Sequence, residues 1–293
     1  MEYILQQSIN ALGWGSVMAL LGAGYTMTFG IIGLVNFAHG EVLMAGAIAA
    51  YIAMSVFDLP FWAGVIASIA GSVAIGLIIE RVCFKPVRNV GMITLFIVSL
   101  GASIILRNLS ILTLGDQLKP FLVPDYFAGA FTFGNLYIFK KNIIIFSLTV
   151  LIGVTLATFV RKTKLGVAMR SVSYDSPLSQ TMGINTEKII VLTFILSSIL
   201  CGISAVFWGL LYGYVSSSIG VEAVVAAFIA SVVGGIGNIN GAIASGYILG
   251  IGGALFVAFL PPDLVGLRPL FLWLVFFLIL FLKPSGLFRA NIK

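Results

Sequence analysis

The sequence has few charged residues. Asp, Glu, Lys and Arg make up 9% of its 293 residues, whereas they make up roughly a quarter of a soluble globular domain. Hydrophobic residues account for 60% of the chain, and its mean hydropathy is +1.15. A water-soluble fold of this composition would expose large apolar patches, which mark interaction surfaces or cause aggregation. The composition therefore excludes an ordinary soluble domain and indicates a membrane protein.

Cysteine and histidine are scarce as well. Cys83 and Cys201 are the only cysteines and lie far apart, and His39 is the only histidine. This excludes a disulfide framework and a Cys/His metal cluster, so we expect no metal site. Neither H-E-x-x-H nor G-x-S-x-G occurs, and one histidine with few acids is a poor catalytic set. We therefore expect no catalytic residues and no enzyme activity.

Signatures for nucleotides and nucleic acids are also missing. The sequence contains no Gly-Lys dipeptide, and a P-loop requires one. We therefore expect no cofactor in this chain, and any ATP hydrolysis must come from another chain. The net charge is +6, but the basic residues lie between apolar runs without interleaved aromatics, so we expect no nucleic-acid partner.

Long apolar runs dominate what is present. A helix rises about 1.5 Å per residue, so roughly 20 apolar residues cross the hydrocarbon core, and lipid requires the backbone of each run to be helical. We expect an all-α, polytopic membrane bundle with about nine transmembrane segments, within a range of roughly eight to ten. The expected runs are residues 9–32, 42–57, 61–79, 90–106, 142–160, 189–212, two within 223–262 on either side of a glycine-rich break, and 267–282.

Basic residues identify the cytoplasmic side of such a bundle. Eleven of the 16 Lys and Arg residues fall in the 80–90 loop, the 161–188 loop and the C-terminal segment. We therefore expect residues 161–188 to be cytoplasmic, residues 107–141 to form a periplasmic loop, and the C-terminus to be cytoplasmic. Nine crossings then place the N-terminus outside. Residues 1–293 are expected to form a single transmembrane domain.

Ionisable residues inside the membrane are costly and usually face a protein interior or a wet cavity. The candidates are His39, Glu41 and Glu222. His39 and Glu41 stand with Asn36 and Gly40 at the junction of the first two apolar runs. One interpretation is a broken helix that lines a substrate path, as in other transporters. The alternative is a polar turn at the membrane surface that ties helices together.

A second cluster, GGIGNING, combines glycines with asparagines without charge. Gly234, Gly235 and Asn238 are its candidate pathway residues, in an unwound stretch or a close helix contact. The alternative is a short loop with packing of small residues, because the surrounding spacing fits small-xxx-small contacts.

The loop at residues 161–188 is the most polar part of the chain. Asp175, Ser176 and Pro177 can begin a short helix, because proline is tolerated in a first turn. Gly183 then suits the end of that helix. The segment is either a docking element for a soluble partner or an ordinary charged loop.

Four stretches resemble the branched-chain amino acid permease family of ABC importers, in that family's order and nearly from end to end. The NFAHGE motif is highly specific, and the resemblance is closer to the H-type subunit than to its M-type partner. The stretches are GIIGLVNFAHGEVLMAGAIAAY (30–51), ERVCFKPVR (80–88), GVAMRSVSYDSPLSQTMGIN (166–185) and VVGGIGNINGAIASGYILG (232–250).

The resemblance implies a multi-pass permease domain in the cell inner membrane that moves branched-chain amino acids by alternating access. It implies a second permease subunit in a heterodimer, two cytoplasmic ATPase subunits that bind ATP, and a periplasmic substrate-binding protein. It also implies that the 161–188 loop holds a coupling helix that contacts the ATPase.

The residues assigned to that coupling are Arg170, Asp175, Met182 and Gly183. Gly183 matches the family pattern, whereas the Asp175-Ser176-Pro177 sequence departs from its run of small residues. This departure puts the start of the coupling helix in question, but not the role of the loop.

Two other transport functions compete with this interpretation. Importers of urea and short-chain amides use closely similar permeases. A proton-driven secondary transporter would instead use His39 and Glu41 as a proton relay.

Overall fold

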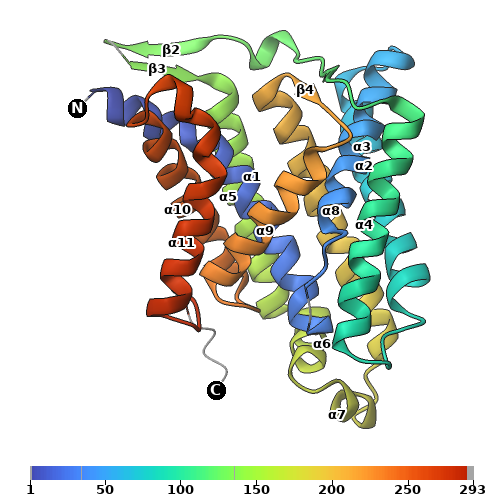
Figure 1. Ribbon diagram of the computed structural model, residues 1–293. Helices are drawn as coiled ribbons and strands as arrows, with labels where there is room; N and C mark the ends of the chain where they lie inside the picture. Colours follow the sequence, from blue (N-terminus) through green and yellow to red (C-terminus); the bar gives the residue numbers. More distant parts are fainter. Residues whose placement is uncertain (1, 34, 135, 289–293) are drawn as a thin grey trace.

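The chain folds into a bundle of apolar helices, which confirms the expected all-α membrane class. The computed structural model describes residues 2–33, 35–134 and 136–288. Figure 1 shows the long helices side by side, with short strands at one end and two short helices at the other.

The helices are α1 (Glu2–Ile32), α2 (His39–Tyr51), α3 (Phe61–Ile78), α4 (Met92–Leu114), α5 (Lys140–Lys162), α6 (Lys164–Tyr174), α7 (Ser176–Thr181), α8 (Thr186–Tyr212), α9 (Ile219–Gly234), α10 (Ile239–Ala258) and α11 (Arg268–Leu282). One π-helical turn continues α2 through Ile52–Val56 and another continues α3 through Ile79–Phe84. The strands are β1 (Lys119–Pro120), β2 (Ala130–Phe133), β3 (Leu136–Phe139) and β4 (Tyr214–Val215), and 3-10 turns lie at Asp125–Phe127 and Pro262–Leu267.

Each of the nine expected apolar runs falls on one helix of the described chain. Seven helices are long and apolar enough to cross a membrane alone, counting the π-helical extensions. Two are shorter: α9 has 16 residues, or about 24 Å of helix, and α11 has 15, or about 22 Å. Both are below the roughly 30 Å of a hydrocarbon core. The number of complete crossings therefore stays a prediction.

The two ends of the bundle differ. The first turn of α1 and the β2–β3 hairpin lie at one end, and α6, α7 and the lower end of α11 lie at the opposite one (Figure 1). The β2–β3 pair is antiparallel, with Ala130 opposite Phe139. At the same end β1 pairs with β4, with Lys119 opposite Val215. The expected 107–141 loop is shorter than predicted, because residues 107–114 continue α4; three strands follow. The 161–188 loop contains two helices.

α1 lies at the centre of the bundle and packs against α10, α8, α9 and α5. Small residues make this close packing possible. A Cβ atom on Gly250 would overlap the main chain of Gly15, and one on Gly246 would overlap the main chain at Ala19. Such small-residue contacts let membrane helices approach closely, because lipid supplies no hydrophobic drive between them.

Candidate functional site

The second apolar run begins deep inside the bundle. α1 ends at Ile32, and residues 35–38 are not helical before α2 starts at His39. The His39 ring packs edge-on against Tyr25, with 5.3 Å between ring centroids. Tyr25 lies seven residues before the end of α1. The start of α2 is therefore about 10 Å from that end, measured back along the axis of α1 into the bundle. Residues 33 and 35–38 are thus a non-helical junction between α1 and α2, which fits both a broken helix and a polar turn that ties two helices together.

A second helix, α9, also begins after a non-helical stretch, but this stretch enters from the opposite end of the bundle. α8 runs opposite to α1 and is followed by β4 and a non-helical stretch to Ser218, after which α9 turns back into the bundle (Figure 1). The Ser217 hydroxyl donates to the Gly115 carbonyl at 3.0 Å and accepts from Ser110 Oγ at 2.8 Å. These bonds hold the descending stretch against the end of α4. Two interrupted segments therefore enter the bundle from opposite ends.

The starts of α2 and α9 meet in the interior. A Cβ atom on Gly40 would overlap the Gly220 carbonyl oxygen. The Glu41 carboxylate lies beside Gly220, and a Cβ atom on Gly220 would be 2.6 Å from Glu41 Oε2. The Ser103 hydroxyl of α4 donates to Glu41 Oε1 at 3.0 Å. Glu222 follows in the first turn of α9, with an exposed side chain.

Glu41 is the electrostatic centre of this contact. Its side chain is 1% exposed, and Oε2 has no hydrogen-bond partner among the described residues. A helix N-terminus carries a partial positive charge from its free N–H groups. Glu41 lies in the first turn of α2 and next to the first turn of α9, so both helix ends favour its negative charge. Interrupted helices whose N-termini point to a common place form substrate sites in other transporters.

His39 and Glu41 point toward different neighbours. His39 is buried between α1 and α8, with Nε2 3.3 Å from Cys201 Sγ. Asn36 is buried too, and its Oδ1 accepts from the Ala38 N–H at 3.0 Å, which closes the turn before α2. The predicted residues Asn36, His39, Gly40 and Glu41 are thus brought together, but His39 and Glu41 do not face each other as a proton relay requires.

The glycine-rich cluster lies elsewhere. Gly234 ends α9, about 21 Å along that helix from Gly220. Gly235 and Gly237 have positive φ angles of 93° and 81°. The Gly237 N–H donates to Thr26 Oγ1 at 3.0 Å, near the end of α1. The structure therefore does not bring this cluster to Glu41.

Asn238 caps the helix that follows this turn. Its Oδ1 accepts from the Gly241 N–H at 3.0 Å, and its Nδ2 donates to the Phe288 carbonyl at 2.8 Å. Packing is close here, because a Cβ atom on Gly234 would collide with the main chain of Gly241. The geometry is that of a capped turn between α9 and α10 that also holds the C-terminal segment.

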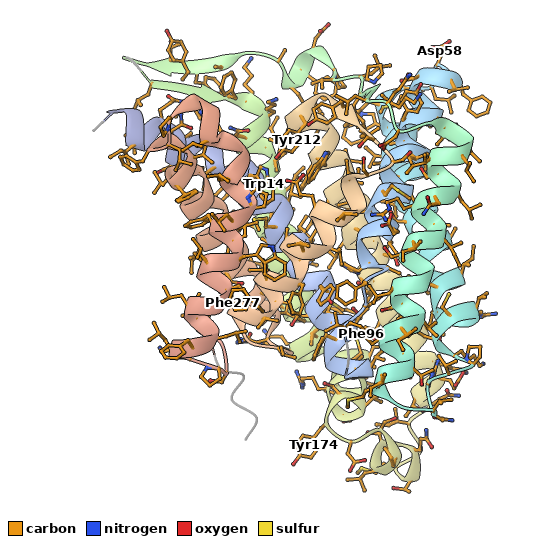
Figure 2. The ribbon with its side chains drawn as sticks, in the orientation of Figure 1. Trp14, Asp58, Phe96, Tyr174, Tyr212 and Phe277 are labelled. Atoms are coloured by element: carbon orange, nitrogen blue, oxygen red, sulfur yellow. The ribbon has the colours of Figure 1, made fainter. Side chains whose placement is uncertain are left out.

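The 161–188 segment projects from the bundle as two helices, and Tyr174 extends outward at the end of the first (Figure 2). Arg170 Nη1 donates to the Val160 carbonyl at 2.8 Å and caps the end of α5. Asp175 Oδ1 accepts from the Leu178 N–H at 2.8 Å and caps α7. Met182 follows α7 with 75% of its surface exposed, and Gly183 ends the helix with φ +82°.

Sequence reasoning missed three partners of the candidate residues: Ser103, Gly220 and Tyr25. Tyr25 and Ser103 lie in ordinary apolar runs and Gly220 lies between two of them, and the importance of each arises only from a neighbour distant in sequence. It also missed α6, although Thr163 is an N-cap whose Oγ1 accepts from the Gly166 N–H at 3.0 Å. Among the described residues no group of three or more His, Cys, Asp or Glu side chains is placed to hold a metal ion.

Comparisons with known proteins point to one family. Residues 7–282 match the family described as “Branched-chain amino acid transport system / permease component”. The chain is 35% identical to the high-affinity branched-chain amino acid transport system permease protein LivH of Escherichia coli (strain K12), over 97% of this chain and 95% of that protein. It is 38% identical to the corresponding BraD protein of Pseudomonas aeruginosa, over 85% of each chain.

A solved structure supports the fold. PsaBC from Streptococcus pneumoniae in complex with Fab aligns with a TM-score of 0.54 and 12% sequence identity, covering 97% of this chain and 93% of that one. At this identity the likeness concerns the arrangement of helices alone.

Proposed function

The chain belongs to the family of permease components of branched-chain amino acid transport systems, and from this premise we propose that it imports branched-chain amino acids as one membrane subunit of an ABC transporter. The observation that carries the proposal is the similarity to such permeases along almost the whole chain. The protein is a multi-pass membrane protein, and we place it in the cell inner membrane. Its relatives are permeases, and we infer that it has no enzyme activity of its own.

ATP would act through other subunits. The chain lacks the Gly-Lys of a P-loop, so we assign ATP binding to two cytoplasmic ATPase subunits and no cofactor to this chain. The further partners are a second, different permease subunit and a periplasmic substrate-binding protein. α7 supports an ATPase contact, because it stands at one end of the bundle with Leu178 and Met182 exposed (Figure 1).

The orientation follows from the basic residues. Lys85 and Arg88 pair with Glu187 at the start of α8, at the end of the bundle that carries α6 and α7. Lys162 and Arg170 lie at the same end. We therefore assign this end, with the 161–188 coupling loop and the C-terminus, to the cytoplasm. The 107–141 loop and the N-terminus are then periplasmic, and residues 1–293 form one permease domain.

Alternating access would act on the contact between α2 and α9. Each of these helices enters from a different end of the bundle, so movement of one against the other changes which side is open. We propose that Asn36, His39, Gly40 and Glu41 form the buried part of the pathway. Gly234, Gly235 and Asn238 would lie on its cytoplasmic side, where α9 turns into α10.

Motion from the ATPase would enter through α7. The residues assigned to this step have defined local roles: Asp175 starts α7, Gly183 ends it, Met182 is exposed beside it, and Arg170 ties α6 to the end of α5. A rigid, capped helix transmits displacement better than a loop. We therefore propose that α7 moves as a unit with the ATPase surface that it contacts.

The substrate would be a small zwitterion with an apolar side chain. Urea and short-chain amides are the competing substrates, because related permeases take them. A proton-coupled mechanism has little support here, since His39 packs on Tyr25 and Cys201 and not on Glu41.

Reconstitution tests the proposal. The permease, its partner subunits and the ATPases are placed in liposomes, with ATP in the lumen and the binding protein outside. We expect uptake of labelled leucine that requires ATP and persists when a protonophore collapses the proton gradient. Labelled urea and acetamide serve as competing substrates. Uptake that follows the proton gradient without ATP, or that prefers urea, would refute the proposal.

A further inference from the structure

A cavity of about 700 Å³ lies between α7 and the bundle. Its walls come from the end of α1, the turn after α3, the first turns of α4 and α8, and α7 itself. The cavity is separate from the contact between α2 and α9, whose residues do not line it. Its volume is within the roughly 300–1,000 Å³ that small-molecule sites occupy.

Four charged side chains form a chain of ion pairs at this cavity. Arg88 pairs with Glu80 at 2.6 Å and with Glu187 at 3.0 Å, and Lys85 pairs with Glu187 at 2.9 Å. The Glu80 side chain is 0% exposed and that of Arg88 is 20% exposed, so Glu80 fixes the guanidinium in the wall. The other two side chains, of Lys85 and Glu187, are 55% and 51% exposed.

A ligand can replace the ion pair between Lys85 and Glu187 with ion pairs of its own. Exposed ion pairs contribute little to stability, about 0–1 kcal/mol. A carboxylate that enters the cavity can therefore bind Lys85 and Arg88, while an ammonium group binds Glu187. The positive charges of Lys85 and Arg88 equal the negative charges of Glu80 and Glu187, so the cluster has no net charge. This disfavours a purely anionic ligand such as phosphate or a lipid headgroup.

Apolar side chains line the wall beside these charges. Ile31 and Ile32 come from α1, Phe84 from the π-helical end of α3, Leu95 from α4 and Ile190 from α8. Opposite charges next to an aliphatic wall match an amino acid with a branched apolar side chain, since the wall can bury that side chain while the charges pair.

We propose that this cavity is an inner binding site for the imported amino acid, and that its occupation slows further import. The ligand carboxylate binds Lys85 and Arg88, its ammonium group binds Glu187, and its side chain packs against the apolar wall. Ser176 and Gln180 of α7 also line the cavity, so a ligand there bridges α7 to the bundle and favours one position of that helix. The inference rests on the proposed function for the identity of the ligand and for the cytoplasmic side.

The test uses the complete transporter in liposomes, with ATP in the lumen and the binding protein outside. Unlabelled leucine, leucinamide or 4-methylpentanoate is enclosed with the ATP. Initial uptake of labelled leucine and ATP hydrolysis are measured, each relative to the same variant with no enclosed compound. We expect enclosed leucine to lower both rates. Leucinamide lacks the carboxylate and 4-methylpentanoate lacks the ammonium group, so neither should do so.

Two substitutions make the test specific. Lys85→Met should weaken inhibition by leucine about tenfold, the effect of losing one charge-assisted hydrogen bond. Lys188→Met is the matched control, because Lys188 follows Glu187 on the same helix but does not line the cavity. Glu187→Gln removes the partner of the ligand's ammonium group. In this variant 4-methylpentanoate should inhibit uptake, and leucine should inhibit it no more strongly than 4-methylpentanoate does.

Several outcomes would overturn the inference. They are normal uptake with enclosed leucine, equal inhibition in Lys85→Met and the parent, and inhibition of the parent by 4-methylpentanoate as strong as that by leucine. The last outcome would indicate a general anion site. Absence of ATP-dependent leucine uptake in liposomes with no enclosed compound would instead overturn the proposed function, so the two failures are distinguishable.

Discussion

Gly40 of α2 lies against the main chain of Gly220 in α9, so closely that a Cβ atom on Gly40 would overlap the Gly220 carbonyl oxygen. The contact joins the first turns of two helices that enter the bundle from opposite ends. Close approach of two backbones requires residues without side chains. This pair therefore sets how near the two interrupted segments can come.

Gly40→Ala should destabilise the protein and abolish most uptake. The added methyl group has no room, and overpacking typically costs about 1–3 kcal/mol. Thermal unfolding in detergent and leucine uptake in liposomes measure the two effects. Gly101→Ala is the control, because Gly101 lies within α4 and, apart from its chain neighbours and the adjacent backbone of that helix, nothing lies within 4 Å of its added Cβ. If Gly40→Ala unfolds at the same temperature as the parent and takes up leucine at the same rate, the α2–α9 contact is looser than the structure indicates.

Glu41→Gln should lower the uptake rate more than it lowers stability. The amide keeps a partner for Ser103 but loses the negative charge that both helix ends favour. Hydrogen bonds to charged groups contribute about 1.5–3 kcal/mol, so we expect uptake to fall roughly 10- to 100-fold. Glu41→Ala should also lower the unfolding temperature, since it leaves the Ser103 hydroxyl without its acceptor.

The control for this prediction is Asp58→Asn. Asp58 lies in a turn at the strand-bearing end of the bundle (Figure 2) and has φ +49°, a conformation that asparagine tolerates. Like Glu41→Gln, the Asp58→Asn substitution changes one carboxylate to an amide, but it does so far from the α2–α9 contact. Equal losses of uptake in the two variants would argue against a pathway role for Glu41.

Much of the fold was predictable because each apolar run must become a helix in lipid. The ends of the helices were less predictable. The fourth run was expected to end before Arg107, yet α4 continues to Leu114. Asn108 is helical, and its side chain donates to the Ile104 carbonyl at 2.7 Å, within the same helix. A polar residue at the end of an apolar run therefore does not define the end of its helix.

The candidate site was predictable only in part. The motif around Glu41 indicated both the family, which the comparisons confirm, and the break between α1 and α2. Its partner Ser103 lies 62 residues away in sequence, and no local pattern links the two. Such a pairing depends on how whole helices pack, which one sequence without relatives does not reveal.

Met182→Glu should uncouple ATP hydrolysis from uptake without unfolding the protein. Met182 is 75% exposed, so a charge there costs the isolated subunit little, but it would oppose burial of α7 against an ATPase. We expect the complex to hydrolyse ATP while leucine uptake falls about tenfold or more, as for a charge placed in an apolar interface. Val90→Glu is the control, since Val90 is 67% exposed at the same end of the bundle. Normal uptake in Met182→Glu would exclude this residue from coupling.

Arg88→Met should be among the most destabilising changes at the end of the bundle that carries α6 and α7. It leaves the carboxylate of Glu80 buried, with a side chain that is 0% exposed, and removes its ion pair at 2.6 Å. Breaking a buried pair by removing one partner typically costs about 3–5 kcal/mol, because the remaining charge is not compensated. Unfolding of the detergent-solubilised protein, followed by intrinsic tryptophan fluorescence, measures this loss.

A double-mutant cycle separates the charge from the packing of the side chain. Glu80→Gln combined with Arg88→Met removes both charges, so the double variant should be more stable than Arg88→Met alone. Lys85→Met is the comparison, because among the described residues Lys85 forms an ion pair with the half-exposed Glu187 alone, and exposed pairs contribute about 0–1 kcal/mol. If Arg88→Met and Lys85→Met lose the same stability, Glu80 does not depend on Arg88, and the guanidinium is not fixed in the wall of the cavity as the structure indicates.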